Sequence, residues 1–153
     1  MITLIQRVTS ARVTVGGEII GEIGHGLLLF VGVEAGDSPN DADTTARKIA
    51  SMRVFPGRTP TDLAVGDRDG SCLVISQFTL AADLRHGNRP DFTAAAPPAP
   101  AADLYQRVAS NLAAAGLRVA TGRFGASMQV ESCNDGPVSL ILTVREGKVV
   151  ARH

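Results

Sequence analysis

A cluster of polar residues follows an apolar stretch in the middle of the chain. Residues 72–75 (Cys-Leu-Val-Ile) are typical of a buried strand, and Ser76, Gln77, Phe78 and Thr79 come directly after them. The end of a strand presents backbone N–H groups and short polar side chains to a ligand. We therefore treat this segment as a candidate binding site. The alternative is an ordinary strand end, whose hydroxyls satisfy nearby backbone groups.

A second polar segment lies between two apolar stretches near the end of the chain. It reads Asn134-Asp135-Gly136-Pro137 and is dense in residues that form turns, so its composition favours a hairpin turn. Only about 5–6% of X–Pro bonds in folded proteins are cis. The composition therefore does not predict a cis bond before Pro137.

Cations gather in residues 85–90 (Arg-His-Gly-Asn-Arg-Pro). Arg85 and Arg89 are candidates for contacts with phosphates, which position a nucleic acid without reading its sequence. The alternative is a solvated surface loop.

The overall composition limits the classes of function. The chain has 153 residues, of which 44% are hydrophobic and 20% charged, so it can form a core. Fifteen basic residues balance fifteen acidic ones, which excludes a broad electrostatic grip on nucleic acid but not a grip on one nucleotide. No apolar run approaches the roughly 20 residues of a membrane helix. We find no phosphate-binding loop, dinucleotide fingerprint or metal-ligand spacing, so neither a cofactor nor a metal is expected.

The two cysteines indicate a compartment. Cys72 and Cys133 both lie in apolar, strand-like surroundings, and we predict that both are buried free thiols. Free thiols are typical of a reducing compartment, so we expect a cytoplasmic protein.

The elements that must position these residues are mostly strands. Helices are predicted from Ser38 and Pro39, which are typical of a helix start, and over residues 101–115, followed by Gly116. Residues 56–70, rich in Pro, Gly and Asp, predict an exposed loop. Alternating or continuous apolar residues predict strands over 11–15, 19–23, 27–33, 52–55, 72–75, 117–120, 127–132 and 138–144. This order predicts one compact α+β domain over residues 1–153, with a mainly antiparallel sheet or partly closed, barrel-like sheet and two principal helices.

Taken together, seven short segments closely resemble the D-aminoacyl-tRNA deacylase family, also described as D-tyrosyl-tRNA deacylases. They occur in the family's order and spacing over essentially the whole chain. The segments are 6–8 (Gln-Arg-Val), 76–80 (Ser-Gln-Phe-Thr-Leu), 87–90 (Gly-Asn-Arg-Pro), 95–98 (Ala-Ala-Pro-Pro), 121–126 (Thr-Gly-Arg-Phe-Gly-Ala), 128–130 (Met-Gln-Val) and 134–138 (Asn-Asp-Gly-Pro-Val). The chain departs from the family at Ser139, where Thr is usual, and at Ala81, where an aromatic residue is usual.

The resemblance implies an enzyme that proofreads the handedness of amino acids in translation. Members of the family hydrolyse the ester between a D-amino acid and the 3′-terminal adenosine of tRNA. They are homodimers with an active site at each subunit interface. The Gly136–Pro137 bond would be cis and would project into the partner's pocket as a backbone wall. Such a wall rejects an L side chain by collision, whereas glycine, which has no side chain, should pass.

The resemblance also suggests roles for individual residues. We expect the backbone N–H groups of Phe78 and Thr79 to stabilise the oxyanion. No base accompanies the Thr79 hydroxyl in its motif, so we expect water to attack instead, assisted by the terminal ribose 2′-hydroxyl. The remaining expected contacts are Ser76, Gln77, Phe124 and Met128 with the substrate, and Arg85 and Arg89 with tRNA phosphates.

Two other functions fit the same residues. One is a non-catalytic module that binds adenosine or the tRNA 3′-end, or an editing module of a synthetase. The other is a serine or threonine hydrolase of small esters, which would need a base near Thr79.

Overall fold

Seven strands and two α-helices make up residues 1–151, the part of the chain that the computed structural model describes. The last two residues of the expected domain lie outside it. The strands are β1 (Ile2–Val15), β2 (Glu18–Ile23), β3 (Gly26–Gly32), β4 (Ser71–Ser76), β5 (Arg118–Thr121), β6 (Gln129–Arg145) and β7 (Lys148–Val150). The helices are α1 (Pro39–Ser51) and α2 (Pro98–Ala114), and two short 3-10 turns are η1 (Gly66–Arg68) and η2 (Phe78–Ala81).

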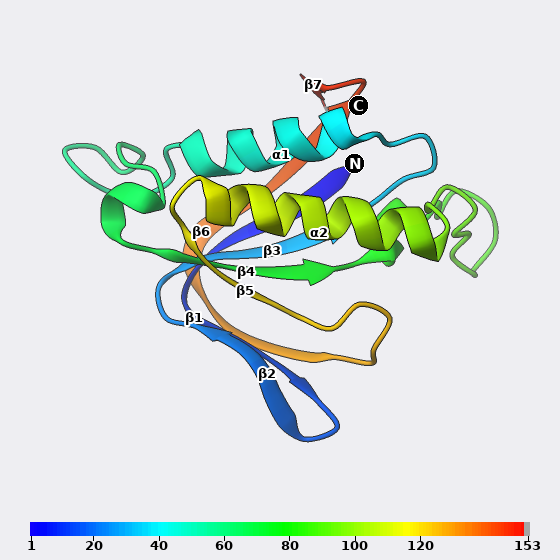
Figure 1. The fold of residues 1–153 in the computed structure, drawn as a ribbon, viewed down its shortest axis with the longest axis horizontal. Helices are drawn as coiled ribbons and strands as arrows, with labels where there is room; N and C mark the ends of the chain where they lie inside the picture. The colour runs from blue at the N-terminus through cyan, green and yellow to red at the C-terminus, as the bar shows by residue number, and fades with distance from the viewer. Residues whose placement is uncertain (152–153) are drawn as a thin grey trace.

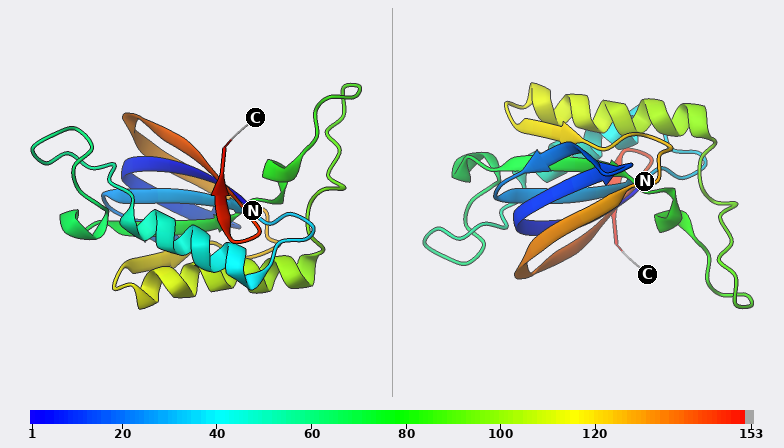
Figure 2. Two further views of the ribbon diagram at one scale, coloured as in Figure 1. Left: turned by 90° about the horizontal axis from the view of Figure 1, so that it is seen from above. Right: turned by 90° about the horizontal axis from the view of Figure 1, so that it is seen from below.

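The strands form one curled, mixed sheet in the order β5-β4-β3-β1-β6-β7, with β2 also paired to β1 (Figure 1). β1 pairs antiparallel with β2, β3 and β6, whereas β3–β4 and β4–β5 are parallel. The parallel pairs arise because α1 and α2 are crossover helices, which return the chain to the same end of the sheet. Both helices lie side by side on one face of the sheet (Figure 2). The expected α+β fold with two principal helices and a partly closed sheet is confirmed.

The main core lies between the sheet and the two helices, and a smaller one lies inside the curl of the sheet. Residues 72–75 of β4 are at most 1% exposed, so the predicted central strand is confirmed. The curl brings β2 close to β5. A Cβ atom at Gly21 would lie 2.6 Å from the carbonyl oxygen of Thr121, so this approach requires glycine. Neither described helix has the length and apolar composition needed to cross a membrane.

Both helices begin at residues that favour a helix start. Ser38 caps α1, and its N–H donates to the Asp41 carboxylate at 2.8 Å, as in a capping box. The second helix begins at Pro98, three residues before the predicted start. Proline is favoured in the first helical turn, where its missing N–H would have no acceptor anyway, so the proline-rich segment belongs to the helix. Gly116 follows α2 with φ +89°.

The predicted hairpin at residues 134–138 is wrong, because β6 is one continuous strand through this segment. The long strand β1 pairs with β6 on both sides of it, through Gln6–Ser139 and Val8–Asn134. Two residues along β1 therefore span the same stretch as five residues along β6. The extra residues of β6 form a bulge, a feature that turns side chains and backbone out of a sheet. We call Asp135, Gly136 and Pro137 the corner.

Three smaller predictions also need correction. Residues 52–55 form no strand. Instead Phe55 makes an isolated bridge with Leu63, because the chain folds back on itself there. The loop 56–70 is mostly exposed, but Val65 is fully buried. The sequence analysis also missed β7.

The cysteines differ in burial. Cys72 is buried and Cys133 is exposed, and both are free. The prediction of a buried thiol is therefore wrong for Cys133, because neither core cluster includes its part of β6, where residues 131–134 are all exposed.

Candidate active site

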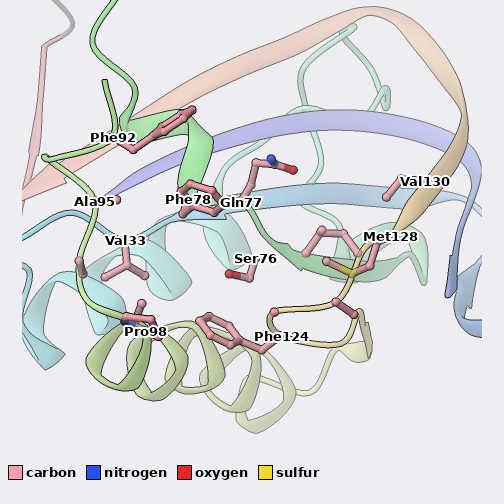
Figure 3. A pocket seen from close by; sticks show the side chains of 15 residues that line it. Val33, Ser76, Gln77, Phe78, Phe92, Ala95, Pro98, Phe124, Met128 and Val130 are labelled. Carbon is pink, nitrogen blue, oxygen red and sulfur yellow. The ribbon is translucent and has the colours of Figure 1, made fainter. Parts of the chain in front are cut away.

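A cavity of about 570 Å³ opens at the carboxyl end of β4 (Figure 3). Ligands of α/β sheets commonly bind beyond the carboxyl ends of parallel strands. The cavity is bordered by residues from β3–β4, η2, the segment before α2, the first turn of α2 and the segment between β5 and β6. These residues are Val33, Ile75, Ser76, Gln77, Phe78, Phe92, Ala95, Ala96, Pro98, Ala101, Phe124, Gly125, Ala126, Met128 and Val130.

Aromatic rings stand on two sides of this cavity. Phe78 packs edge-on against Phe92 with ring centroids 5.2 Å apart, and Phe124 lies across from them (Figure 3). The exposed fractions of Phe78, Phe92 and Phe124 are 55%, 38% and 37%. Large apolar side chains that remain exposed around a cavity are typical of a binding site. The three rings can therefore contact a flat or apolar ligand.

The buried Tyr105 supports the ring of Phe124 from behind. The two ring centroids are 6.1 Å apart, and the Tyr105 hydroxyl donates to the carbonyl oxygen of Val74 at 2.9 Å. Burial raises the pKa of this hydroxyl. Tyr105 therefore joins α2 to the central strand directly beneath the cavity.

Another wall of the cavity is irregular backbone, held by the segment that follows β3. The N–H of Ala35 donates to Ala94 at 2.8 Å, and the N–H of Ala96 donates to Val33 at 3.0 Å. These bonds fix the segment that leads into α2, so the wall is built from small residues close to rigid backbone.

The side chains of Ser76 and Gln77 point in different directions at the end of β4. The Ser76 hydroxyl lies in the cavity between Phe78 and Phe124, whereas the Gln77 carboxamide points away from it (Figure 3). The Gln77 amide donates to the Thr79 hydroxyl at 2.5 Å. Thr79 is exposed and does not border the cavity.

The backbone at η2 offers hydrogen-bond donors. Within residues 1–151, neither the Phe78 N–H nor the Thr79 N–H donates to a protein acceptor. The first N–H groups of a helical turn lack an acceptor within the turn. Two amides next to the cavity are therefore free to bind a ligand oxygen.

The corner lies apart from this cavity in a single chain. The Gly136–Pro137 bond is cis, and both residues are exposed and absent from the cavity lining. The Arg7 guanidinium contacts the Asp135 carboxylate, with Nε 2.9 Å from Oδ2, and its Nη1 donates to the Val54 carbonyl at 2.6 Å. The corner is thus tied to β1 but is not part of its own chain's cavity.

Arg85 and Arg89, which are expected to contact phosphates, differ in their surroundings. Both lie in residues 83–91, which we call the arm. Arg85 is bound to Asp83 through Nε at 2.9 Å and through Nη2 at 2.5 Å. Hydrogen bonding from Arg85 lowers the pKa of Asp83 to about 2. Arg89 is exposed and pairs with no acid among residues 1–151.

Sequence reasoning missed several residues of the site. Phe92, Val33 and Ala101 border the cavity, yet none lies in a polar cluster, and the pattern of the sequence does not point to a cavity. Phe92 could have been found from the sequence, because the chain has only five phenylalanines and this one lies close to the cationic residues 85–90. Among the described residues, no group of three or more His, Cys, Asp or Glu could hold a metal ion.

These observations define a small α+β domain whose cavity, at the end of the central strand, suits a ligand with a flat, apolar part and has free amides beside it. The family model described as D-Tyr-tRNA(Tyr) deacylase matches residues 4–143. The chain belongs to this family.

Relatives support the assignment over nearly the whole chain. A protein of Cereibacter sphaeroides named D-aminoacyl-tRNA deacylase is 51% identical over 92% of this chain and 97% of the relative. One of Ruegeria pomeroyi with the same name is 50% identical over 94% of this chain and 100% of the relative.

Solved structures share the fold. One described as c-Myc DNA unwinding element binding protein has a TM-score of 0.88 at 37% identity, covering 95% of this chain and 99% of that chain. Another, described as a probable eukaryotic D-amino acid tRNA deacylase, has a TM-score of 0.78 at 14% identity, covering 92% and 97%. At that identity the second shows the fold alone.

Proposed function

We propose that this protein hydrolyses the ester that joins a D-amino acid, or glycine, to the 3′-terminal adenosine of tRNA. The reaction returns free tRNA and keeps D-residues out of translation, and we place it in the cytoplasm. The observation that carries the proposal is the pair of unbonded amides at Phe78 and Thr79 beside an aromatic cavity. Family membership and the names of relatives about half identical over nearly the whole chain support the same reaction.

The chemistry needs no nucleophilic side chain. Water attacks the ester carbonyl, and the negative charge that develops on its oxygen is stabilised by backbone N–H donors. The Thr79 hydroxyl has the Gln77 amide as its partner rather than a base, and an unactivated hydroxyl is a poor nucleophile. The 2′-hydroxyl of the terminal ribose is the remaining group that can assist the water.

The cavity suits the terminal adenosine and its amino acid. Its volume of about 570 Å³ falls within the usual range of roughly 300–1,000 Å³ for small-molecule sites. Phe124 and Met128 would contact the base or the amino acid, and the Ser76 hydroxyl would bind a polar group of the ester. Gln77 would act by fixing Thr79 and the turn that carries the two amides.

Discrimination between the hands of an amino acid requires a second chain. The corner is exposed, and it does not border its own cavity. Leu140 and Ile141, each 41% exposed, follow it on β6 and offer apolar area for a subunit contact. In a homodimer, the partner's corner would form a backbone wall beside Cα of the bound amino acid. An L side chain would collide with this wall, and a D side chain would point elsewhere.

The test compares D-tyrosyl-tRNA with L-tyrosyl-tRNA. We expect release of D-tyrosine, little release of L-tyrosine, and a mass in light scattering of twice that of the chain. A protein that retains both tRNAs without releasing amino acid would be a binding module and would contradict the proposal. Inhibition by a serine-directed phosphonate that labels Thr79 would instead indicate a hydrolase with a hydroxyl nucleophile.

A further inference from the structure

The arm is fixed to the mouth of the cavity at its base. The N–H of Asp83 donates to the carbonyl of Asp91 at 2.8 Å, and the N–H of Asp91 returns a bond at 3.0 Å. Phe92, directly after the arm, borders the cavity and packs on Phe78. The arm extends away from the body of the molecule in both views of Figure 2, so its outer part projects beyond the mouth.

Both carboxylates of the arm are used at this base. Asp83 is bound by Arg85, and Asp91 Oδ1 accepts from the N–H of Thr93 at 2.8 Å. Arg85 is therefore neutralised by an acid of the arm itself. Arg89, which is exposed, has no ion-pair partner in the described part of the chain.

A second unpaired cation lies on the segment that borders the other side of the cavity. Arg123 is exposed, forms no ion pair with any described residue, and directly precedes Phe124. Phe124 and Phe92 border the cavity from opposite sides (Figure 3). The arm and the segment that carries Arg123 also lie at the same end of the molecule in Figure 1.

From this placement we propose that Arg89 and Arg123 form a two-point phosphate clamp on the single RNA strand that leaves the cavity. The inference rests on the proposed function, because it needs the 3′-terminal nucleotide inside the cavity. The phosphodiesters of the preceding nucleotides then emerge between two cations. Arg89 is free because both acids of the arm are engaged elsewhere, and Arg123 pairs with no acid in the described part of the chain. Arg85, which is already paired with Asp83, is not part of the clamp.

The test measures how salt weakens the interaction with tRNA. Each phosphate contact to a single strand contributes a slope of about 0.7 to the dependence of log affinity on log salt concentration. We expect Arg89→Ala and Arg123→Ala each to raise KM for D-tyrosyl-tRNA several-fold and to lower the slope by about 0.7, with kcat unchanged. The double variant should lose about twice that slope.

Two control variants test the assignment. Arg85→Ala removes a cation that is already paired, so its slope should match that of the wild type. Arg58→Ala removes an exposed cation in the loop 56–70, at the opposite end of the molecule (Figure 1), and should also have no effect. A slope lowered equally by Arg85→Ala or Arg58→Ala, or unchanged in Arg89→Ala and Arg123→Ala, would overturn the clamp.

A truncated substrate separates this proposal from the function on which it rests. D-Tyrosyl adenosine carries the ester but no upstream phosphate, so the four single variants and the double variant should all hydrolyse it like the wild type. A loss on this substrate in Arg89→Ala would assign that residue to the cavity and contradict the clamp. If the wild type hydrolyses neither substrate, the proposed function fails. The proposed clamp is then tested by the binding of uncharged tRNA, measured by fluorescence anisotropy. The same changes in salt dependence are expected for the same variants.

Discussion

Arg7 and Asp135 form an ion pair between β1 and β6, with Nε 2.9 Å from Oδ2 and side-chain exposures of 10% and 46%. The geometry is that of a charge contact and not of a hydrogen bond, because the Nε–H has no aligned acceptor. The guanidinium is also anchored to the Val54 carbonyl at 2.6 Å and lies 5.9 Å from the centroid of the Phe55 ring. Arg7 stands opposite the bulge of β6 and holds the residue that precedes Gly136.

Removal of the Asp135 carboxylate should loosen the corner. We expect Asp135→Asn to lower the free energy of unfolding by about 1–2 kcal/mol, between the effects typical of exposed and of buried ion pairs, because the largely buried Arg7 charge loses its partner. The ratio of D-tyrosyl-tRNA to L-tyrosyl-tRNA hydrolysis should fall as well. Chemical denaturation and deacylation rates measure the two effects.

A second ion pair on the same two strands provides a matched control for this variant. Arg12 and Glu131 form an exposed pair at 2.7 Å, and such pairs typically contribute less than about 1 kcal/mol. Glu131→Gln should therefore leave the D-to-L ratio unchanged. An equal loss of discrimination in both variants would show that Asp135 acts only through general stability.

Substitution of Thr79 distinguishes the backbone mechanism from a nucleophilic hydroxyl. The Thr79 hydroxyl accepts from the Gln77 amide and does not border the cavity. We expect Thr79→Ala to lower the single-turnover rate on D-tyrosyl-tRNA by less than about tenfold, because the backbone N–H remains. Loss of a true nucleophile would cost about 10⁴-fold or more, and such a loss would reinstate the hydroxyl as the attacking group.

Much of the fold was predictable because its signals are local. The apolar residues 72–75 are at most 1% exposed in the structure, and Ser38 caps α1 as expected. The course of β6 was not predictable, because a turn-forming composition at residues 134–138 competes with pairing to a strand 14 residues long. That pairing joins residues more than 120 positions apart, so no local pattern contains it.

The site was predictable only where its residues form motifs. Ser76, Phe78, Phe124 and Met128, which lie in the motifs of the family resemblance, all border the cavity, and their roles toward a substrate stay predictions. The pairing of Arg85 with Asp83 was not anticipated, because it depends on how the arm folds at its base. The composition of the sequence therefore located the cations. Only the folded structure shows that Arg85 is paired with an acid, whereas Arg89 has no such partner in the described part of the chain.

Glycine provides a direct test of rejection by collision. Glycyl-tRNA has no side chain to meet a backbone wall, so we expect the protein to hydrolyse it at a measurable rate. L-Alanyl-tRNA, which adds one methyl group on the rejected side, should be resistant. D-Alanyl-tRNA serves as the positive control. Inertness toward glycyl-tRNA, with normal turnover of D-alanyl-tRNA, would contradict the wall.

Cys72 should make the protein less stable at alkaline pH. Burial raises the pKa of its thiol from 9.0 to about 12, so the folded chain retains a proton that the unfolded chain releases. Because the unfolded state then binds fewer protons, the free energy of unfolding falls as the pH rises above 9.0, by about 1.4 kcal/mol per pH unit up to about pH 12. Urea denaturation between pH 8.5 and 10.5 measures this slope. Cys72→Ala should remove the thiol's share of it, whereas Cys133→Ser, which alters an exposed thiol, should retain it. An equal slope in the wild type and in Cys72→Ala would show that burial does not raise the pKa of the Cys72 thiol.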